Sequence, residues 1–163
     1  MRLFDKRSFG ADCAAEFLDK QYAPFHLPGS YDTARAAISE FQKFLDLPEA
    51  EKSRWDFRDA TGKANDGWMP RDGGNAPYVA TRGVLKKDQK DWWHWSPRMH
   101  DIIRERGLAG LSRSLAEASE ACWQFHQRAW LEVLAVLDAA LPGRQLQMLA
   151  MHPSSQRMCT LRL

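Results

Sequence analysis

Small or apolar residues recur every three or four positions between residues 114 and 141. This is the spacing of one face of an α-helix, so the pattern predicts a single long helix there. A second apolar stripe runs along the C-terminal half of the same segment. Because a helix that is apolar on two faces is usually covered on two faces, we expect the rest of the chain to pack around it. The first stripe is Leu115, Ala118, Cys122, Phe125, Ala129, Val133, Val136 and Ala140, and the second is Trp130, Leu134, Leu137 and Leu141.

Shorter helices are expected on both sides of that segment. The first carries the apolar residues from Ala14 to Leu18 and can be capped by Ser8 or Asp12. The second begins at Ser30, which can cap it, and continues to Leu45. A short helix over residues 48–57 is expected because proline fits a first helical turn, and another is expected over residues 146–151. The buried side of the second helix is predicted to be Ala34, Ala37, Ile38, Phe41, Phe44 and Leu45.

Alternation of apolar and polar residues predicts strands over residues 22–27, 78–85 and 156–163. Glycine, proline and asparagine between residues 59 and 76 predict a long loop. Trp68 and Met69 in the middle of that loop argue against a disordered linker, which has no use for large apolar anchors. The last strand reaches Leu163. Because an unpaired terminal strand is an aggregation hazard, we expect its sheet to continue beyond that residue.

Composition places the chain among ordinary globular domains. With 163 residues it is long enough for one domain with a core, and a net charge of +2 does not favour nucleic acid or an anionic membrane as a partner. The N-terminus lacks the apolar run of a signal peptide, and no segment is apolar enough to span a bilayer, so a cytoplasmic protein is expected. Cys13, Cys122 and Cys159 are widely spaced and odd in number, which favours buried thiols in a reducing compartment.

Tryptophan is the most unusual feature of the composition. The chain has seven, and five of them fall between positions 55 and 95. Large amphipathic rings suit a pocket wall or an interface, and they equally suit a tightly packed small core. For Trp92, Trp93 and Trp95 the core interpretation is favoured.

No complete catalytic set is visible in the sequence. The chain contains no Gly-x-Ser-x-Gly elbow, no phosphate-binding loop and no dinucleotide fingerprint. Its histidines do not form His-x-His, His-x-Asp or His-Glu-x-x-His pairs, so no local metal motif is present. The five histidines are His26, His94, His100, His126 and His152.

Several short motifs nevertheless occur in a characteristic order. An aromatic segment runs from Tyr22 to Gly29, although Pro28 stands where a histidine is usual. It is followed by an "F…LP…EK" helix junction and by a glycine-aromatic pair. An acidic, lysine-containing and aromatic segment, the long helix and a final Leu-Arg strand come after these. The residues are Phe44, Leu47, Pro48, Glu51 and Lys52; Gly67 and Trp68; Asp88, Gln89, Lys90, Asp91, Trp92, Trp93 and His94; and Leu161, Arg162 and Leu163.

In this order and spacing, the chain from about Cys13 to Leu163 resembles the N-terminal region of the isopenicillin N synthase-like 2-oxoglutarate/iron(II) oxygenases. The resemblance implies an α+β fold: a helix-rich region, a long backbone helix and the first strands of an incomplete double-stranded β-helix, or jelly roll. One stripe of the long helix would then face the N-terminal helices, and the other would face the sheet that the final strand begins. Residues 1–163 would form a single domain, with most of the catalytic barrel after residue 163.

The resemblance also implies an oxidoreductase acting on a small organic molecule by hydroxylation, desaturation or cyclisation. Iron(II) and 2-oxoglutarate would be cofactors of the complete protein, held by residues after Leu163, since a facial triad leaves open positions for cosubstrate and dioxygen. This chain alone would bind neither group and catalyse nothing. The loop after the Lys52 helix would supply substrate contacts, although Trp68 could instead be a plug that pins the loop to the core. The candidate substrate-binding residues are Asn65, Trp68, Met69 and Tyr78.

Two other function classes are weighed against this one. A non-catalytic helical interaction module could use a Trp-rich surface to bind a partner, and stable, cooperative folding of the 163 residues would favour it. A helical DNA-binding protein is disfavoured by the weak charge balance and by the lack of a basic recognition helix. Substrate, reaction subtype and oligomeric state are not specified by the sequence.

Overall fold

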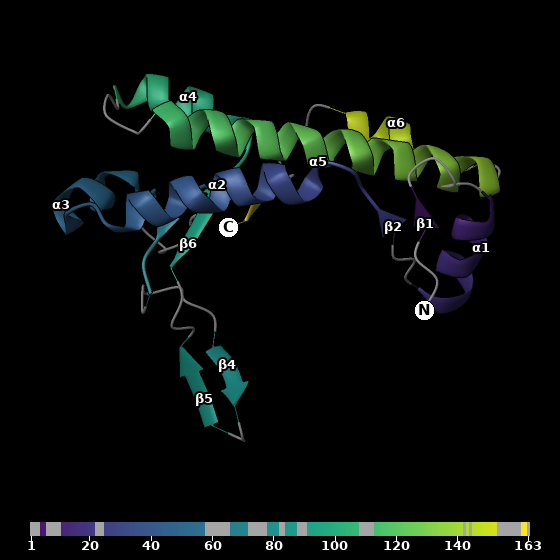
Figure 1. Cartoon of the computed structure of the whole chain (residues 1–163), viewed down its shortest axis with the longest axis horizontal. Coiled ribbons are helices and arrows are strands. Elements are labelled where there is room, and N and C mark those ends of the chain that lie inside the picture. The colour runs from purple at the N-terminus through teal and green to yellow at the C-terminus, as the bar shows by residue number, and fades with distance from the viewer. Residues whose placement is uncertain are drawn as a thin grey trace.

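The computed structural model describes residues 4–5, 11–21, 25–57, 66–71, 78–81, 84–87, 91–107, 113–141, 143, 145–152 and 161–162. These residues form a helix-rich α+β fold built along one long helix (Figure 1). The helices are α1 (Ala11–Lys20), α2 (Ser30–Leu45), α3 (Glu49–Lys52), α4 (Arg98–Glu105), α5 (Arg113–Ala140) and α6 (Leu146–Met151), and a 3₁₀ turn at Ser53–Trp55 follows α3. The strands are β1 (Phe4–Asp5), β2 (Phe25–His26), β3 (Gly67–Met69), β4 (Tyr78–Thr81), β5 (Val84–Lys87), β6 (Trp92–Trp95) and β7 (Leu161–Arg162). None of the described helices is long and apolar enough to cross a membrane.

The predicted long helix is confirmed as α5, which spans 28 residues. Helix α2 packs along it, and α6 and α1 contact its C-terminal half (Figure 1). The prediction for α2 is correct at both ends, but its cap is not Ser30. The N-cap is Gly29 at φ +85°, a left-handed conformation that glycine adopts without strain, and the Thr33 hydroxyl donates to the Gly29 carbonyl.

A three-stranded antiparallel sheet lies against one end of this helical layer. Its strand order is β3-β6-β7, with Trp68 opposite Trp93 and Trp95 opposite Leu161. The structure therefore contains a strand within the segment predicted as a loop. The sequence did not predict this strand because three residues are too few to show a period. For the predicted final strand, Leu161 and Arg162 are confirmed as β7, and residues 156–160 and 163 lie outside the described residues.

The segment predicted as one strand over residues 78–85 is two strands. β4 and β5 pair antiparallel, with Thr81 opposite Val84 and Tyr78 opposite Lys87. This hairpin projects away from the helical layer (Figure 1). Of the strand predicted over residues 22–27, Phe25 and His26 form β2, which pairs parallel with β1, and residues 22–24 lie outside the described part of the chain.

Two separate hydrophobic clusters divide α5 along its length. The N-terminal half belongs to an aromatic cluster between α2 and the sheet, and the C-terminal half belongs to an aliphatic cluster with α1 and α6. The expectation of two stripes with separate tasks is therefore wrong in its geometry: the division is between the two ends of the helix. Trp130, in the second stripe, is 50% exposed. The aromatic cluster is Phe41, Phe44, Trp55, Phe57, Trp68, Trp93, Trp95, Met99, Leu115 and Trp123, and the aliphatic cluster is Ala14, Val133, Leu134 and Leu137.

Candidate functional site

The register of β3 against β6 gives the three-stranded sheet two different faces. Residues opposite each other on antiparallel strands point to the same side, and successive residues point to opposite sides. Trp68 pairs with Trp93 and faces the aromatic cluster. Met69 pairs with Trp92, and Gly67 pairs with His94, so these residues lie on the other side. Trp68 and Met69 are therefore neighbours in sequence that serve opposite faces.

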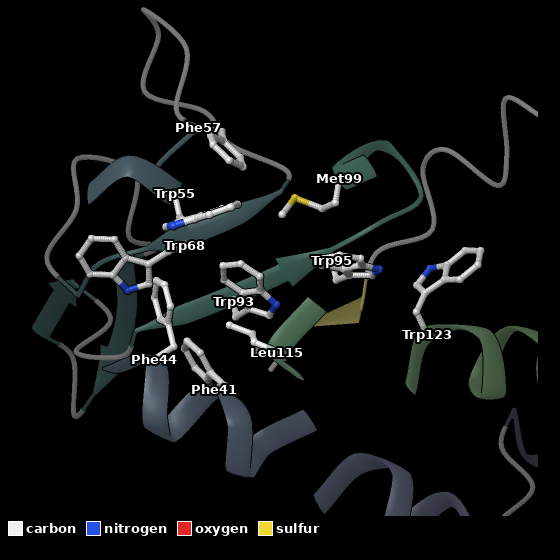
Figure 2. Close-up of a cluster of buried hydrophobic side chains, with 10 residues drawn as sticks. All are labelled: Phe41, Phe44, Trp55, Phe57, Trp68, Trp93, Trp95, Met99, Leu115 and Trp123. Carbon is white, nitrogen blue, oxygen red and sulfur yellow. The ribbon is translucent and has the colours of Figure 1, made fainter. Parts of the chain in front are cut away.

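On the side of the helices, Trp68 is an anchor within the core. Its ring lies beside the Phe44 ring (Figure 2), at a centroid distance of 6.3 Å and in an edge-on arrangement. The Lys52 ammonium group is 5.4 Å from the centroid of the Trp68 ring. The indole Nε1 is buried, and no hydrogen-bond partner is found for it among the described residues. This packing fits a plug that pins the loop to the core, and substrate contact by Trp68 stays a prediction.

The face opposite Trp68 and Trp93 carries a thioether, an indole and an imidazole. Met69 is 8% exposed and His94 is 5% exposed, while Trp92 is partly buried. The Trp92 and His94 rings lie 6.3 Å apart. Opposite His94, Gly67 contributes no side chain, and on the other neighbouring strand His94 is in register with Arg162. We call Met69, Trp92 and His94 the second face.

The two remaining candidates are not brought to this face by any described contact. Asn65 lies outside the described residues. Tyr78 begins β4, where its backbone pairs with Lys87, in the hairpin that projects from the layer. Of the four predicted substrate-binding residues, Met69 alone is seen on the second face. Sequence reasoning missed the partnership of Trp92 and His94, although their spacing of two residues was a usable signal once that segment is taken as a strand.

A buried polar group at the start of β3 was also missed. The Asp66 carboxyl is 4% exposed, and its Oδ1 accepts a hydrogen bond of 2.5 Å from the Ser96 hydroxyl. The nearest guanidinium nitrogen of Arg98 is 4.0 Å from Oδ2. Burial raises the pKa of Asp66, and the Ser96 bond and the Arg98 charge only partly offset that effect. An aspartate in a glycine-rich segment gives no sequence signal that it will be buried.

A second polar group ties β6 and α4 to α5. The Glu120 carboxylate accepts hydrogen bonds from Trp95 Nε1 at 2.7 Å and from Gln124 Nε2 at 2.6 Å. His100 Nε2 lies 3.4 Å from the same carboxylate. Deeper in the cluster, Trp93 Nε1 donates to the buried Ser119 hydroxyl at 3.0 Å. These bonds satisfy indole donors inside the core, so the role of this group is structural.

The Cys122 and His126 pair does not form a nucleophilic dyad. The sulfur lies 3.6 Å from His126 Nδ1, but that nitrogen is also 2.8 Å from the Cys122 carbonyl oxygen, to which it can only donate. Burial raises the pKa of the Cys122 thiol, which disfavours the reactive thiolate. The predicted buried thiol is confirmed for Cys122, and the side chains of Cys13 and Cys159 are not described.

Within the described ranges, no three histidine, cysteine, aspartate or glutamate side chains gather closely enough to hold a metal ion. The described residues therefore do not supply a facial triad for iron(II). The two faces of the β3-β6 pair and the buried Asp66 group are the features that bear on function. No protein-family model matches the chain, and the search of curated proteins gives no match either.

Proposed function

We propose that this chain is the N-terminal portion of a non-haem iron(II)/2-oxoglutarate-dependent oxygenase acting on a small organic molecule. In this proposal α2 and α5 brace one side of a sheet that grows into a jelly roll. The second face of the sheet points toward the substrate. In this proposal iron and 2-oxoglutarate belong to the complete protein and would be held by residues after Leu163, as the resemblance implies.

The observation that carries the proposal is the position of β7. It pairs antiparallel with β6, although the two strands are far apart in the sequence, and Leu161 packs against the aromatic cluster. The strand order β3-β6-β7 adds each new strand at the same edge, with α5 behind. This arrangement is what the resemblance leads one to expect of a Leu-Arg strand that opens a β-barrel.

Substrate contact is assigned to Met69, Trp92 and His94 because the register of the strands places them on the face opposite Trp68 and Trp93. Apolar side chains with a few convergent polar groups are typical of small-molecule sites. His94 supplies the polar group and can donate or accept a hydrogen bond, depending on its tautomer. Trp68 then acts indirectly, by fixing the strand that carries Met69.

The assignment is tested by 2-oxoglutarate turnover of the complete protein, measured as succinate released with substrate present. We expect His94→Ala and Met69→Ala to raise KM for the substrate while leaving substrate-independent 2-oxoglutarate turnover unchanged. Trp130→Ala, on the exposed side of α5, is the control and should change neither. Unchanged KM in both second-face variants would remove the substrate assignment.

Metal binding by the chain alone is a second test. Anaerobic calorimetry of the 163-residue chain with iron(II) should show no tight, stoichiometric binding. Such binding would count against the proposal, because the ligands would then lie within this chain.

Four of the five tryptophans that suggested the interaction-module alternative give it no support. Trp55, Trp68, Trp93 and Trp95 are buried in the aromatic cluster, so they do not form a surface for a partner, while Trp92 is partly buried. The exposed tryptophan among the described residues is Trp130, which lies in the C-terminal half of α5, whereas the aromatic cluster contacts the N-terminal half.

A further inference from the structure

The β3-β6 ladder ends at the pair of Met69 and Trp92, two of the three residues of the second face. Pro70 follows Met69 and has no amide hydrogen to offer to a further backbone pair. The next contact between the two chain segments uses a side chain, because the Asp91 carboxylate accepts three hydrogen bonds from Arg71. An ion pair therefore stands where the next residue pair of the ladder would be.

The contact between Arg71 and Asp91, which we call the clamp, has a defined geometry. Asp91 Oδ1 accepts from the Arg71 backbone amide at 3.2 Å, and Oδ2 accepts from Nε at 3.1 Å and from Nη2 at 2.9 Å. The Asp91 side chain is 11% exposed, and that of Arg71 is 65% exposed. Exposed ion pairs usually stabilise little, because solvent screens them. Here the carboxylate is largely shielded from water and also holds a backbone amide, so the clamp fixes the main chain that leaves β3.

The inner residue pairs of the sheet have further support. β7 pairs with β6 from His94 onward, and Trp93 is buried in the aromatic cluster. Among the described strands, the pairing of β7 with β6 does not extend to Trp92. Met69 and Trp92 lie instead at the end where the chain leaves the sheet for the projecting β4-β5 hairpin (Figure 1). The clamp closes this end of the sheet.

We propose that Arg71 and Asp91 are positioning residues of the second face: their contact holds Met69 and Trp92 in the arrangement that meets the substrate. The two charges compensate each other, and Asp91 engages the Nε and Nη2 donors, so the pair acts through its neighbours and not as a ligand. The substrate role rests on the proposed function. The holding of Met69 depends on neither iron nor 2-oxoglutarate.

Oxidation by hydrogen peroxide tests the clamp in the 163-residue chain, with the sulfoxide at each methionine measured by mass spectrometry. Met69, the reporter, is 8% exposed, whereas Met99 is completely buried and Met148 is 58% exposed, so these two are the core and surface references. In Arg71→Ala and Asp91→Ala we expect Met69 to oxidise several-fold faster than in the unchanged chain, and Met99 to stay protected. Unchanged oxidation of Met69 overturns the clamp. A parallel rise at Met99 also overturns it, because the chain would then be unfolding as a whole.

Further variants separate one shared interaction from two independent effects. Because the two side chains act together, the double variant should oxidise no faster at Met69 than the faster single variant, and additive effects overturn the proposal. Arg71→Lys keeps the amide bond and the positive charge but loses the paired guanidinium donors. It should give an intermediate rate, and it replaces Arg71→Ala if that variant folds poorly. Arg104→Ala breaks an exposed arginine–aspartate pair within α4 and is the matched control, which should leave Met69 oxidation unchanged.

Succinate release by the complete protein tests the link to the substrate, with the small molecule that stimulates this release as the probe. We expect Arg71→Ala and Asp91→Ala to raise KM for that molecule several-fold and to leave kcat nearly unchanged, because bound substrate orders Met69 and Trp92 again. Unchanged KM beside faster Met69 oxidation overturns the positioning role. If no small molecule stimulates release, the proposed function fails and the positioning role fails with it, whereas Met69 oxidation still tests the clamp alone.

Discussion

The two halves of α5 sit in different kinds of core. The N-terminal half packs Leu115 and Trp123 into the aromatic cluster, where Trp93, Trp95, Met99 and Leu115 are completely buried (Figure 2). The C-terminal half packs against α1 and α6 through a few aliphatic residues that each keep some exposure. Large apolar residues stand exposed on the elements around that half, namely Phe17, Leu18, Trp130, Met148, Leu149 and Met151.

The hydrogen bonds that the side chains of α5 make also differ between its two halves. In the aromatic half, indole donors reach into α5 itself, at Ser119 and Glu120. In the aliphatic half, the corresponding polar contact serves a backbone: the Asp138 carboxylate accepts from the amides of Leu146 and Gln147 and so caps α6. The comparison shows that the N-terminal half of α5 packs in a large core with fully buried side chains, which can hold a site in position. Its C-terminal half contacts α1 and α6 through a smaller set of buried side chains.

Leucine truncation at matched positions tests this difference with the largest expected effect. Leu115→Ala should cost about 4 kcal/mol of unfolding free energy, and Leu137→Ala about 2.5 kcal/mol, since a rigid aromatic surround collapses less into the cavity. Leu115 is fully buried and Leu137 is 5% exposed. Urea unfolding measures both, and an equal or reversed loss would contradict the comparison.

Alanine substitution of two glycines gives the next effect. Gly67 and Gly143 both have φ +84°, so each alanine should cost about 1–2 kcal/mol for a left-handed backbone. At Gly67 a Cβ would also collide with the Trp55 carbonyl and lie 2.7 Å from Phe57 Cδ2, which adds about 1–3 kcal/mol of overpacking.

Gly143 is the matched control, because none of the described residues lies within 4 Å of a Cβ built there. We expect the thermal midpoint of Gly67→Ala to fall clearly below that of Gly143→Ala. Similar midpoints would mean that the chain between Trp55 and β3 shifts to accommodate the added methyl group. The packing of the aromatic half would then be less rigid than described.

The buried hydroxyl of Ser119 offers a smaller change in the same half. Ser119→Ala leaves the Trp93 indole donor unsatisfied in the core and should cost about 1–3 kcal/mol. Ser114→Ala removes a hydroxyl at the surface that donates to the Glu40 carboxylate, and should cost less than about 0.5 kcal/mol. The two serines lie on the same helix, so equal losses would show that the Trp93 bond contributes nothing specific.

Acid sensitivity at the start of α5 is the smallest expected effect. The hydrogen bond from Lys43, followed by that from Ser114, lowers the pKa of Glu40. The stabilisation is therefore present above the ordinary glutamate pKa and is lost as pH falls through the lowered, folded value. Acid titration of unfolding should show a shallower decline for Glu40→Gln than for the unchanged chain. Superimposable titrations would remove Glu40 from the contacts that hold α2 to α5.

The long elements could be predicted because their pattern repeats. Helices α2 and α5 contain enough turns for a three-to-four spacing to emerge from the sequence, and their bounds agree closely with prediction. The short strands could not be found in this way. β6 is apolar at three of four positions, so it shows no alternation, and β3 has only three residues.

The candidate site residues were harder to predict than the strands, because the side of the sheet to which a residue points depends on how its strand pairs with its neighbours. Trp68 and Met69 were predicted together, and the register with β6 separates them. Nothing in the sequence indicates that Asp66 is buried or that this burial raises its pKa. Trp130 fits an apolar helix stripe equally well whether or not a neighbour covers it, and in the fold it stays half exposed.

The coding sequence that follows the codon for Leu163 tests the proposed function most directly. The oxygenase proposal predicts a His-x-Asp pair, a more distant histidine and an Arg-x-Ser pair, carried by strands that extend the β3-β6-β7 sheet. A complete gene without these residues would contradict the proposal and leave the chain as a scaffold of another class.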